Sequence, residues 1–214
     1  MKILALEFSS PVRGVAVRGG SKPGYAEEAG GRETRPFSLI DAALRDAGMT
    51  REEVECIAVG LGPGSNAGVR TAISIAQGWQ LARDVKLLGV SSAELVAAHA
   101  AKLGATNPVH VGLMVRPGEL WVASYDASIF ERPKLAEPFR PMSAADAKTI
   151  SLFRTDSGSG TEVVDGFTAL SPGANVLAIL AASRTDFAQG ETLEPISLRP
   201  VQFVKAPPPK FSME

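Results

Sequence analysis

The feature that most constrains the fold is a short apolar run that leads through a glycine-rich loop into a long helical stretch. Residues 56–60 (CIAVG) contain no polar side chain, and the loop at 60–65 (GLGPGS) follows directly. A short run without polar positions is typical of a strand in a parallel sheet with both faces covered. Apolar spacing predicts a helix over residues 66–83. The chain is therefore expected to fold as an α/β protein.

The segments around this unit alternate in the same way. Pro36 stands where a helix begins and Gly48 where it ends. Thr50-x-x-Glu53 and Ser91-x-x-Glu94 both have the spacing of a capping box. Strands are expected at residues 2–8, 12–18, 24–28 and 86–90, and helices at residues 36–47 and 93–103. Strands that alternate with helices imply parallel βαβ units.

A second unit is expected to begin after the turn-forming segment 104–108 (GATNP). The sequence predicts a hairpin of residues 109–115 and 119–125, helices at 143–150 and from Ser171 to about Arg184, and a loop at 156–160. We therefore divide the chain into an N-terminal α/β domain of residues 1–104, a smaller C-terminal α/β domain of residues 105–206 and an extended tail of residues 207–214.

Charge and cysteine content exclude several classes of function. The chain has 22 Lys and Arg side chains against 23 Asp and Glu side chains, so it lacks the basic field that binds a nucleic-acid backbone. The single cysteine, Cys56, excludes an intrachain disulfide and a Cys-rich zinc site. No apolar stretch approaches the roughly 20 residues of a membrane span, and the N-terminus lacks the apolar region of a signal peptide. We expect a cytoplasmic protein without a membrane contact.

The loop that precedes the helix at 66–83 is a candidate anion site. Its glycines permit a close approach to the backbone, and free N–H groups are available where the helix begins. The loop matches neither the Walker nor the Rossmann pattern, and a tight turn without ligand explains the glycines equally well. The candidate phosphate-binding residues are Ser9, Ser10, Gly62, Gly64, Ser65, Gly68 and Arg70.

The helix at 66–83 has two apolar stripes. One contains Val69, Ala72, Ile73, Ala76 and Trp79, and the other contains Ile75, Gly78, Leu81 and Ala82. One stripe can cover the sheet, whereas the other needs a second layer of the same domain or another subunit. We assign the partner or dimer interface to Leu39, Ala43, Val69, Ala72, Ile73, Ala76 and Trp79.

Four blocks occur in a distinctive order: ILALEFSS at 3–10, GPGSNAGVR at 62–70, IAQG at 75–78 and GVSS at 89–92. Together they resemble the TsaB (YeaZ) family, which carries a Gcp-like domain labelled as a non-peptidase relative of peptidase M22. The segments RPGELWVASY (116–125) and PISLR (195–199) are similar to the second domain and the C-terminal motif of the family.

The resemblance implies an actin-like, sugar-kinase-type (ASKHA) fold of two related α/β halves, the second reduced. It also implies a non-catalytic scaffold, without catalytic or metal-binding residues, that pairs with a TsaD-like enzyme in threonylcarbamoylation of N6 of the adenosine beside the anticodon of tRNA. A TsaE-like ATPase is implied as a further partner, a homodimer when the chain is alone, and tRNA only indirectly. ATP, ADP or magnesium is implied only at the complex.

This sequence departs from the family pattern at several positions. It has Glu7 in place of Asp, Asn66-Ala67 in place of Phe-Thr, and Thr34 and Arg35 where a His is usual. Val115 replaces another Asp. These departures identify a divergent member and argue against nucleotide binding by the chain itself.

Two alternatives from other classes are open to test. An actin-like ATPase or phosphotransferase would use Glu7 and the loop Gly62–Ser65, with Asp126 or Asp165 as a second acidic metal ligand. A peptidase would need His99 or His110 as a base, but no Gly-x-Ser-x-Gly elbow occurs in the chain. We therefore expect no protease activity.

Overall fold

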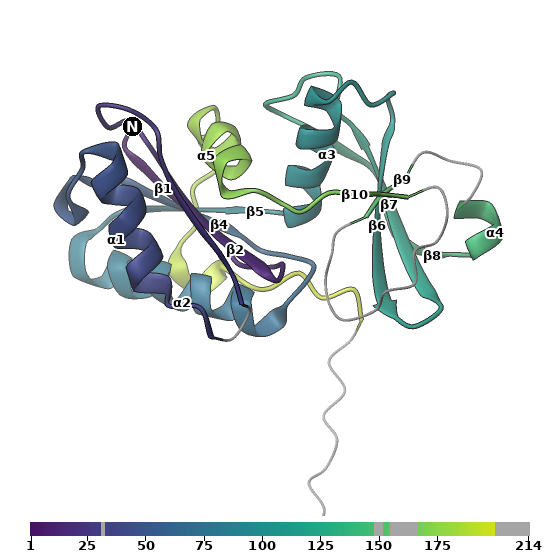
Figure 1. Cartoon of the computed structure of the whole chain (residues 1–214), viewed down its shortest axis with the longest axis horizontal. Helices are drawn as coiled ribbons and strands as arrows, with labels where there is room; N and C mark the ends of the chain where they lie inside the picture. The colour runs from purple at the N-terminus through teal and green to yellow at the C-terminus, as the bar shows by residue number, and fades with distance from the viewer. Residues whose placement is uncertain (31–32, 148–151, 155–166, 200–214) are drawn as a thin grey trace, which may run out of the picture.

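The computed structural model describes residues 1–30, 33–147, 152–154 and 167–199, which form two five-stranded sheets (Figure 1). The first sheet has the order β3-β2-β1-β4-β5. Its strands are β1 (Ile3–Glu7), β2 (Val12–Arg18), β3 (Gly24–Ala29), β4 (Cys56–Gly60) and β5 (Lys86–Val90). β1, β2 and β3 pair antiparallel, and β4 and β5 run parallel to β1. Each expected strand of this half is confirmed.

The helices of the first half also lie where the sequence predicts them. They are α1 (Pro36–Ala47), α2 (Asn66–Arg83) and α3 (Ser92–Lys102), with a 3-10 turn at Arg51–Glu53. Gly48 ends α1 in the left-handed conformation, with φ of 64°. The capping box at Thr50 and Glu53 is confirmed. The second predicted box is wrong, because the Ser91 hydroxyl donates to the Gly62 carbonyl instead.

The second sheet, with the order β10-β9-β6-β7-β8, repeats the topology of the first. Its elements are β6 (Val109–Arg116), β7 (Glu119–Asp126), β8 (Lys134–Met142), α4 (Ala144–Ala147), β9 (Leu152–Arg154), β10 (Phe167–Ala169) and α5 (Ala174–Ala182), followed by a 3-10 turn at Gly190–Thr192. β6, β7 and β8 pair antiparallel, and β9 and β10 run parallel to β6. The expected actin-like fold of two related halves is thus confirmed, with the second half reduced.

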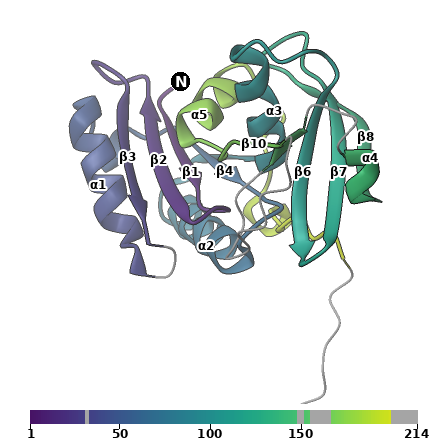
Figure 2. The ribbon, with the colours of Figure 1, turned by 45° about the vertical axis from the view of Figure 1, so that its right-hand side comes forward.

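Two helices cross between the halves. α1 and α2 cover one face of the first sheet, and α5 covers the other (Figure 1). Figure 2 shows α3 between α5 and the second sheet, where Val96 and Ala100 pack against Val109 and Val111. α5 therefore belongs to the second half by sequence but packs on the first sheet, and α3 does the reverse. The predicted boundary after residue 104 stays a prediction.

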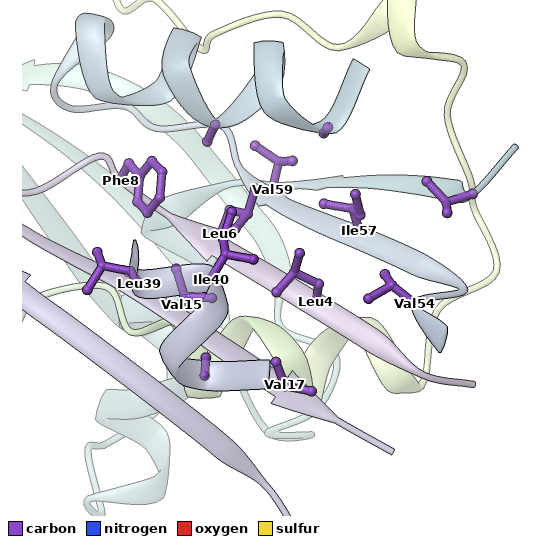
Figure 3. Close-up of a cluster of buried hydrophobic side chains, with 14 of the residues drawn as sticks. Leu4, Leu6, Phe8, Val15, Val17, Leu39, Ile40, Val54, Ile57 and Val59 are labelled. Atoms are coloured by element: carbon purple, nitrogen blue, oxygen red, sulfur yellow. The ribbon is translucent and has the colours of Figure 1, made fainter. Parts of the chain in front are cut away.

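The first sheet is buried because its strands alternate between two cores. Leu4, Leu6 and Phe8 point toward α1 and α2 (Figure 3), whereas Ile3 and Ala5 pack with α5. All five residues of β1 and all five of β4 are buried. The short apolar run at 56–60 was therefore correctly interpreted as a strand covered on both faces.

Several features of the second half differ from the prediction. The hairpin of β6 and β7 is confirmed, but β8, β9 and β10 were not predicted. α5 begins after Gly173 rather than at Ser171. Only residues 144–147 of the expected helix at 143–150 are described as helical. The predicted loop 156–160, the tail 207–214 and Asp165 lie outside the described residues. Within the described ranges, every helix falls short of the length and apolar character that a bilayer crossing requires.

Candidate functional site

The glycine-rich loop lies at the carboxyl edge of the first sheet, beside the turn that joins β1 to β2. Ser65 caps α2 by accepting a hydrogen bond from the Gly68 N–H at 3.3 Å. The Ser65 N–H donates to the Ser9 carbonyl at 2.7 Å, and the Gly62 N–H donates to the Ser92 hydroxyl at 3.0 Å. Three N–H groups that a phosphate would need are therefore already bonded within the chain.

Close backbone packing explains the glycines of this loop. A β-carbon at Gly64 would overlap the Ser9 carbonyl, and one at Gly68 would overlap the Phe8 carbonyl. Gly62 has φ of 82°, a left-handed conformation that favours glycine. The tight turn, one of the two interpretations of the motif, therefore accounts for all three positions without a ligand.

A cavity of about 550 Å³ opens between this loop and the second half. Ser9, Ser10, Gly64 and Ser65 line it, together with residues 113–115 of β6 and the segment Pro195–Arg199. Arg70 lines an adjoining cavity of about 600 Å³, which shares Pro195, Ser197 and Arg199 with the first. The structure therefore brings four of the seven predicted phosphate-binding residues to one cavity, with Gly62 and Gly68 buried behind it.

Glu7 is fully buried at the end of β1. Its carboxylate accepts hydrogen bonds from the Ser9 N–H at 2.7 Å and from the Ser92 hydroxyl at 2.8 Å. Burial raises the pKa of the Glu7 carboxyl above its usual value, although the Ser9 and Ser92 hydrogen bonds oppose that shift. Glu7 thus ties the loop and the start of α3 together, and it is withdrawn from the cavity.

Of the acidic residues named for the ATPase alternative, Glu7 and Asp126 share no metal site among the described residues. Asp126 lies exposed at the end of β7, where its carboxylate accepts hydrogen bonds from Asn107 and Ser128. Asp165 is outside the described residues. The described part of the chain contains no cluster of three His, Cys, Asp or Glu side chains that could hold a metal ion. The arrangement gives no support to metal-assisted phosphoryl transfer.

The predicted interface residues face inward. Figure 3 shows Leu39 and Ile40 of α1 pointing toward Leu6 and Val15 of the sheet. Trp79 is half-buried against the same core. The other six predicted interface residues are each at most 8% exposed: Leu39, Ala43, Val69, Ala72, Ile73 and Ala76. They hold α1 and α2 on the first sheet, so they cannot also be the surface that meets a partner.

The other apolar stripe of α2 faces outward. Leu81 is 90% exposed, Gly78 and Ala82 are exposed, and Ile75 is half-buried. A β-carbon at Gly78 would meet nothing within 4 Å. The sequence identified both stripes and assigned the partner to the stripe that the structure packs on the sheet, since composition does not distinguish them.

The two histidines do not form a hydrolytic site. His99 is half-buried in α3, and its Nδ1 is buried without a hydrogen-bond partner. His110 Nδ1 lies 2.9 Å from the hydroxyl of Ser124, which is itself only 5% exposed. The carboxylate near this pair, Glu137, accepts from Ser124 at 3.5 Å rather than from His110. The order of a serine-protease triad, in which the acid orients the histidine, is therefore absent from these residues.

Two sites were missed by sequence reasoning. Arg13 of β2 is buried beside the Phe8 ring, and the signal was a charged residue inside a mostly apolar strand. Arg199 forms an ion pair with Glu119 across the cavity rim. Its segment is held in place because the Ile196 N–H donates to the Leu61 carbonyl. The Arg199–Glu119 pair and the Ile196–Leu61 hydrogen bond each join residues that are far apart in the sequence.

Comparison with known proteins shows which family this chain is similar to. Residues 2–132 match the family model described as TsaD, tRNA N6-adenosine threonylcarbamoyltransferase. The chain is 30% identical over 127 residues to the tRNA threonylcarbamoyladenosine biosynthesis protein TsaB of Escherichia coli (strain K12), which covers 58% of this chain and 55% of that protein. It is 28% identical over 123 residues to TsaB of Haemophilus influenzae, with 56% and 52% covered. The matched region thus spans about half the length of these curated relatives.

A solved structure extends the likeness to nearly the whole fold. YeaZ from Pseudomonas aeruginosa superposes with a TM-score of 0.74 at 24% sequence identity, covering 92% of this chain and 99% of that chain. At this level of identity the likeness concerns the fold.

Proposed function

The chain belongs to the TsaD family as a divergent TsaB (YeaZ) member, and on this premise we propose that it serves tRNA threonylcarbamoyladenosine biosynthesis as a non-catalytic scaffold. Its partner in this proposal is a TsaD-like enzyme that transfers the threonylcarbamoyl group. The net charge of −1 agrees with contact to tRNA through that partner rather than directly.

The observation that carries the proposal is the outward stripe of α2. Leu81 is almost fully exposed, and the small residues Gly78 and Ala82 leave room for another helix to approach. Phe37, in the first turn of α1, is 55% exposed on the same outer layer. Exposed large apolar side chains on adjacent helices favour a protein interface over a solvated surface.

The hydrogen bonds of Glu7 and of the glycine-rich loop support the proposal that the chain is non-catalytic. Glu7 is buried and bonded, and three N–H groups of the loop are engaged with the chain itself. An active phosphotransferase would need these groups to be accessible to substrate. We further propose a cytoplasmic location, a homodimer in isolation and a TsaE-like ATPase as a third component, as the family resemblance implies.

Gly78→Glu tests the interface without disturbing the fold. A β-carbon here meets nothing within 4 Å, and the glutamate would place a charge within the proposed helix contact. We expect the variant to fold normally and to bind the TsaD-like protein of the same organism at least about 100-fold more weakly than the wild type, measured by calorimetry. Threonylcarbamoyladenosine formation in a strain that lacks its own TsaB should fall in parallel.

The matched control is Ala136→Glu, which places the same charge on exposed residues of β8. It should bind like the wild type. Ala76→Glu is unsuitable because Ala76 is fully buried, and this variant should unfold. Absence of co-elution between the wild-type chain and the TsaD-like protein would refute the proposed function, and full affinity in Gly78→Glu would refute the proposed surface.

A further inference from the structure

Arg13 is a largely buried arginine with one unpaired guanidinium nitrogen. The residue is 5% exposed, and its Nε is buried with no hydrogen-bond acceptor. Among the described residues the contact given for its guanidinium is the ring of Phe8, 5.7 Å from the ring centroid. A buried charge is ordinarily paired and hydrogen-bonded, because removing it from water costs more than a cation–π contact returns. Arg13 therefore destabilises the isolated chain and calls for an anion.

The position of Arg13 is defined by contacts on two sides. The Phe8 carbonyl packs against Gly68 in the first turn of α2. On the other side, Arg13 pairs in register with Glu28 of β3, and the Glu28 carboxylate accepts a hydrogen bond from the backbone N–H of Arg35, which caps α1. Arg13 thus lies between the starts of α1 and α2.

Both helices begin close to this position, α1 with the Glu28 carboxylate at its cap and α2 with the Ser65 hydroxyl at its cap. Neither α1 nor α2 has an acidic residue in its first turn, and Arg35 makes no side-chain capping bond. Helix N-termini carry a partial positive charge that an anion stabilises. Two helix ends and one buried guanidinium therefore converge on the same small region, and the one acid placed beside Arg13 by strand register, Glu28, is bonded to the α1 cap.

The surroundings favour an anion that arrives on a protein surface. Only 5% of Arg13 is exposed, so any anion must lose its water to reach the guanidinium. Phe37, 55% exposed in the first turn of α1, adds an aromatic anchor to the same helix end. A buried arginine next to an exposed aromatic side chain is typical of the energetic centre of a protein interface.

We propose that Arg13 is the receptor for a side-chain carboxylate that the TsaD-like partner inserts between the starts of α1 and α2. The inference rests on the proposed function and specifies one contact within it. In the complex the carboxylate accepts hydrogen bonds from the guanidinium and pairs with its charge. The unpaired arginine is then a feature of the free chain alone, and its cost is offset on binding.

Arg13→Met tests this contact because it should act in opposite directions on folding and on binding. Methionine keeps much of the length and removes the charge, so we expect the melting temperature of the free chain to stay level or rise. The dissociation constant of the complex with the TsaD-like protein should increase at least about 30-fold. Arg13→Lys keeps the charge but loses the planar guanidinium with its paired N–H donors. Its dissociation constant should lie between those of the wild type and Arg13→Met.

Arg18→Met is the matched control, since Arg18 lies exposed at the other end of the same strand. It should change neither quantity. If Arg13→Met fails to fold, the affinity of Arg13→Lys for the TsaD-like protein is the test. An affinity equal to that of the wild type would overturn the proposed contact between the guanidinium and the carboxylate.

The possible failures are distinguishable. If the wild type does not bind the TsaD-like protein, the proposed function fails and the contact with it. If the wild type binds and Arg13→Met binds equally well, only the contact is refuted. If inorganic phosphate raises the melting temperature of the wild type but not of Arg13→Met, while both bind the partner alike, the occupant is a free anion and the proposal is wrong.

Discussion

The two halves of the molecule share a strand order and differ in what covers their sheets. In the first half, α1 has 12 residues and α2 has 18, and together they form an outer layer on the first sheet. In the second half, the corresponding position after the third strand holds α4, with four residues. β8 is exposed along most of its length, whereas β1 is buried throughout. Within the described residues the strands are thus repeated, and the outer helices are not.

The difference in outer helices favours the first half as the place where the proposed partner binds. The outer layer of the first half contributes the exposed stripe of α2, the exposed Phe37 and the unpaired Arg13. The described part of the second half has no helix of comparable length on its outer face. The two sheets of the same strand order form the framework of the fold, and α1 and α2 of the first half carry the candidate docking surface.

The largest expected effect tests whether the two halves depend on each other. Leu177 of α5 is fully buried against the first sheet. Leu177→Ala should lower the free energy of unfolding by about 3–4 kcal/mol. Hydrogen exchange should accelerate in β1 and β2, which are distant in sequence.

The reciprocal variant is Val96→Ala in α3, which should accelerate exchange in β6 of the second half, against which Val96 packs. If each variant loosened only the sheet of its own half, the crossing of α3 and α5 would not couple the two halves energetically.

A smaller effect compares a glycine of the first sheet that packs against a helix backbone with a glycine of the second sheet that packs against a side chain. A β-carbon at Gly24 would overlap the Ala43 carbonyl of α1, whereas one at Gly112 would lie 2.8 Å from the Leu152 side chain. Because a side chain can move and a helix backbone cannot do so locally, Gly24→Ala should cost about 3 kcal/mol and Gly112→Ala about 1 kcal/mol. Urea unfolding measures both, and equal losses would contradict the contrast.

The smallest effect concerns pH. Burial raises the pKa of Glu7, while Arg199 and Trp121 hold the pKa of Glu119 below its usual value of 4.5. For Glu7 the folded state binds the proton more tightly, so its contribution to stability is present below pH 4.5 and is lost as the pH rises through the raised pKa. Glu119 contributes stability above pH 4.5, which is lost as the pH falls through its lowered pKa.

The variants Glu7→Gln and Glu119→Gln separate these two contributions. Relative to the wild type, Glu7→Gln should gain stability as the pH rises from 4.5, and Glu119→Gln should lose stability as the pH rises toward 4.5. The free energy of unfolding, measured by urea titration on both sides of pH 4.5, gives both slopes. Parallel profiles for the wild type and Glu7→Gln would show that Glu7 titrates as if it were exposed.

Much of the first half was predictable because its signals are local. Pro36 and Gly48 mark the ends of α1, and the apolar run at 56–60 marks a buried strand. The second half gives weaker signals. β8 contains Pro138 and Pro141, which argue against a strand and are tolerated here because β8 is at the edge of its sheet. β9 and β10 have three residues each, too few to establish a period.

The candidate site also has features that the sequence shows and features that only the fold shows. The glycines of the loop were identifiable because glycine tolerates conformations that other residues avoid. Their role was not, since only the fold places Gly64 and Gly68 against the backbone of β1 and the turn after it. Arg13 was missed in the sequence although it is a charge within a mostly apolar strand, and that its Nε lacks a partner is known only from the fold.

The sequence by itself determined the order of strands and helices in the first half, the family resemblance and the presence of two apolar stripes on α2. Only the tertiary structure decided which stripe faces the sheet. Periodicity specifies that a helix has an apolar face but not the rotation of that helix about its axis when two faces are apolar. In this chain Gly68 fixes the rotation, because its missing side chain lets α2 press against the Phe8 backbone and turns Leu81 outward.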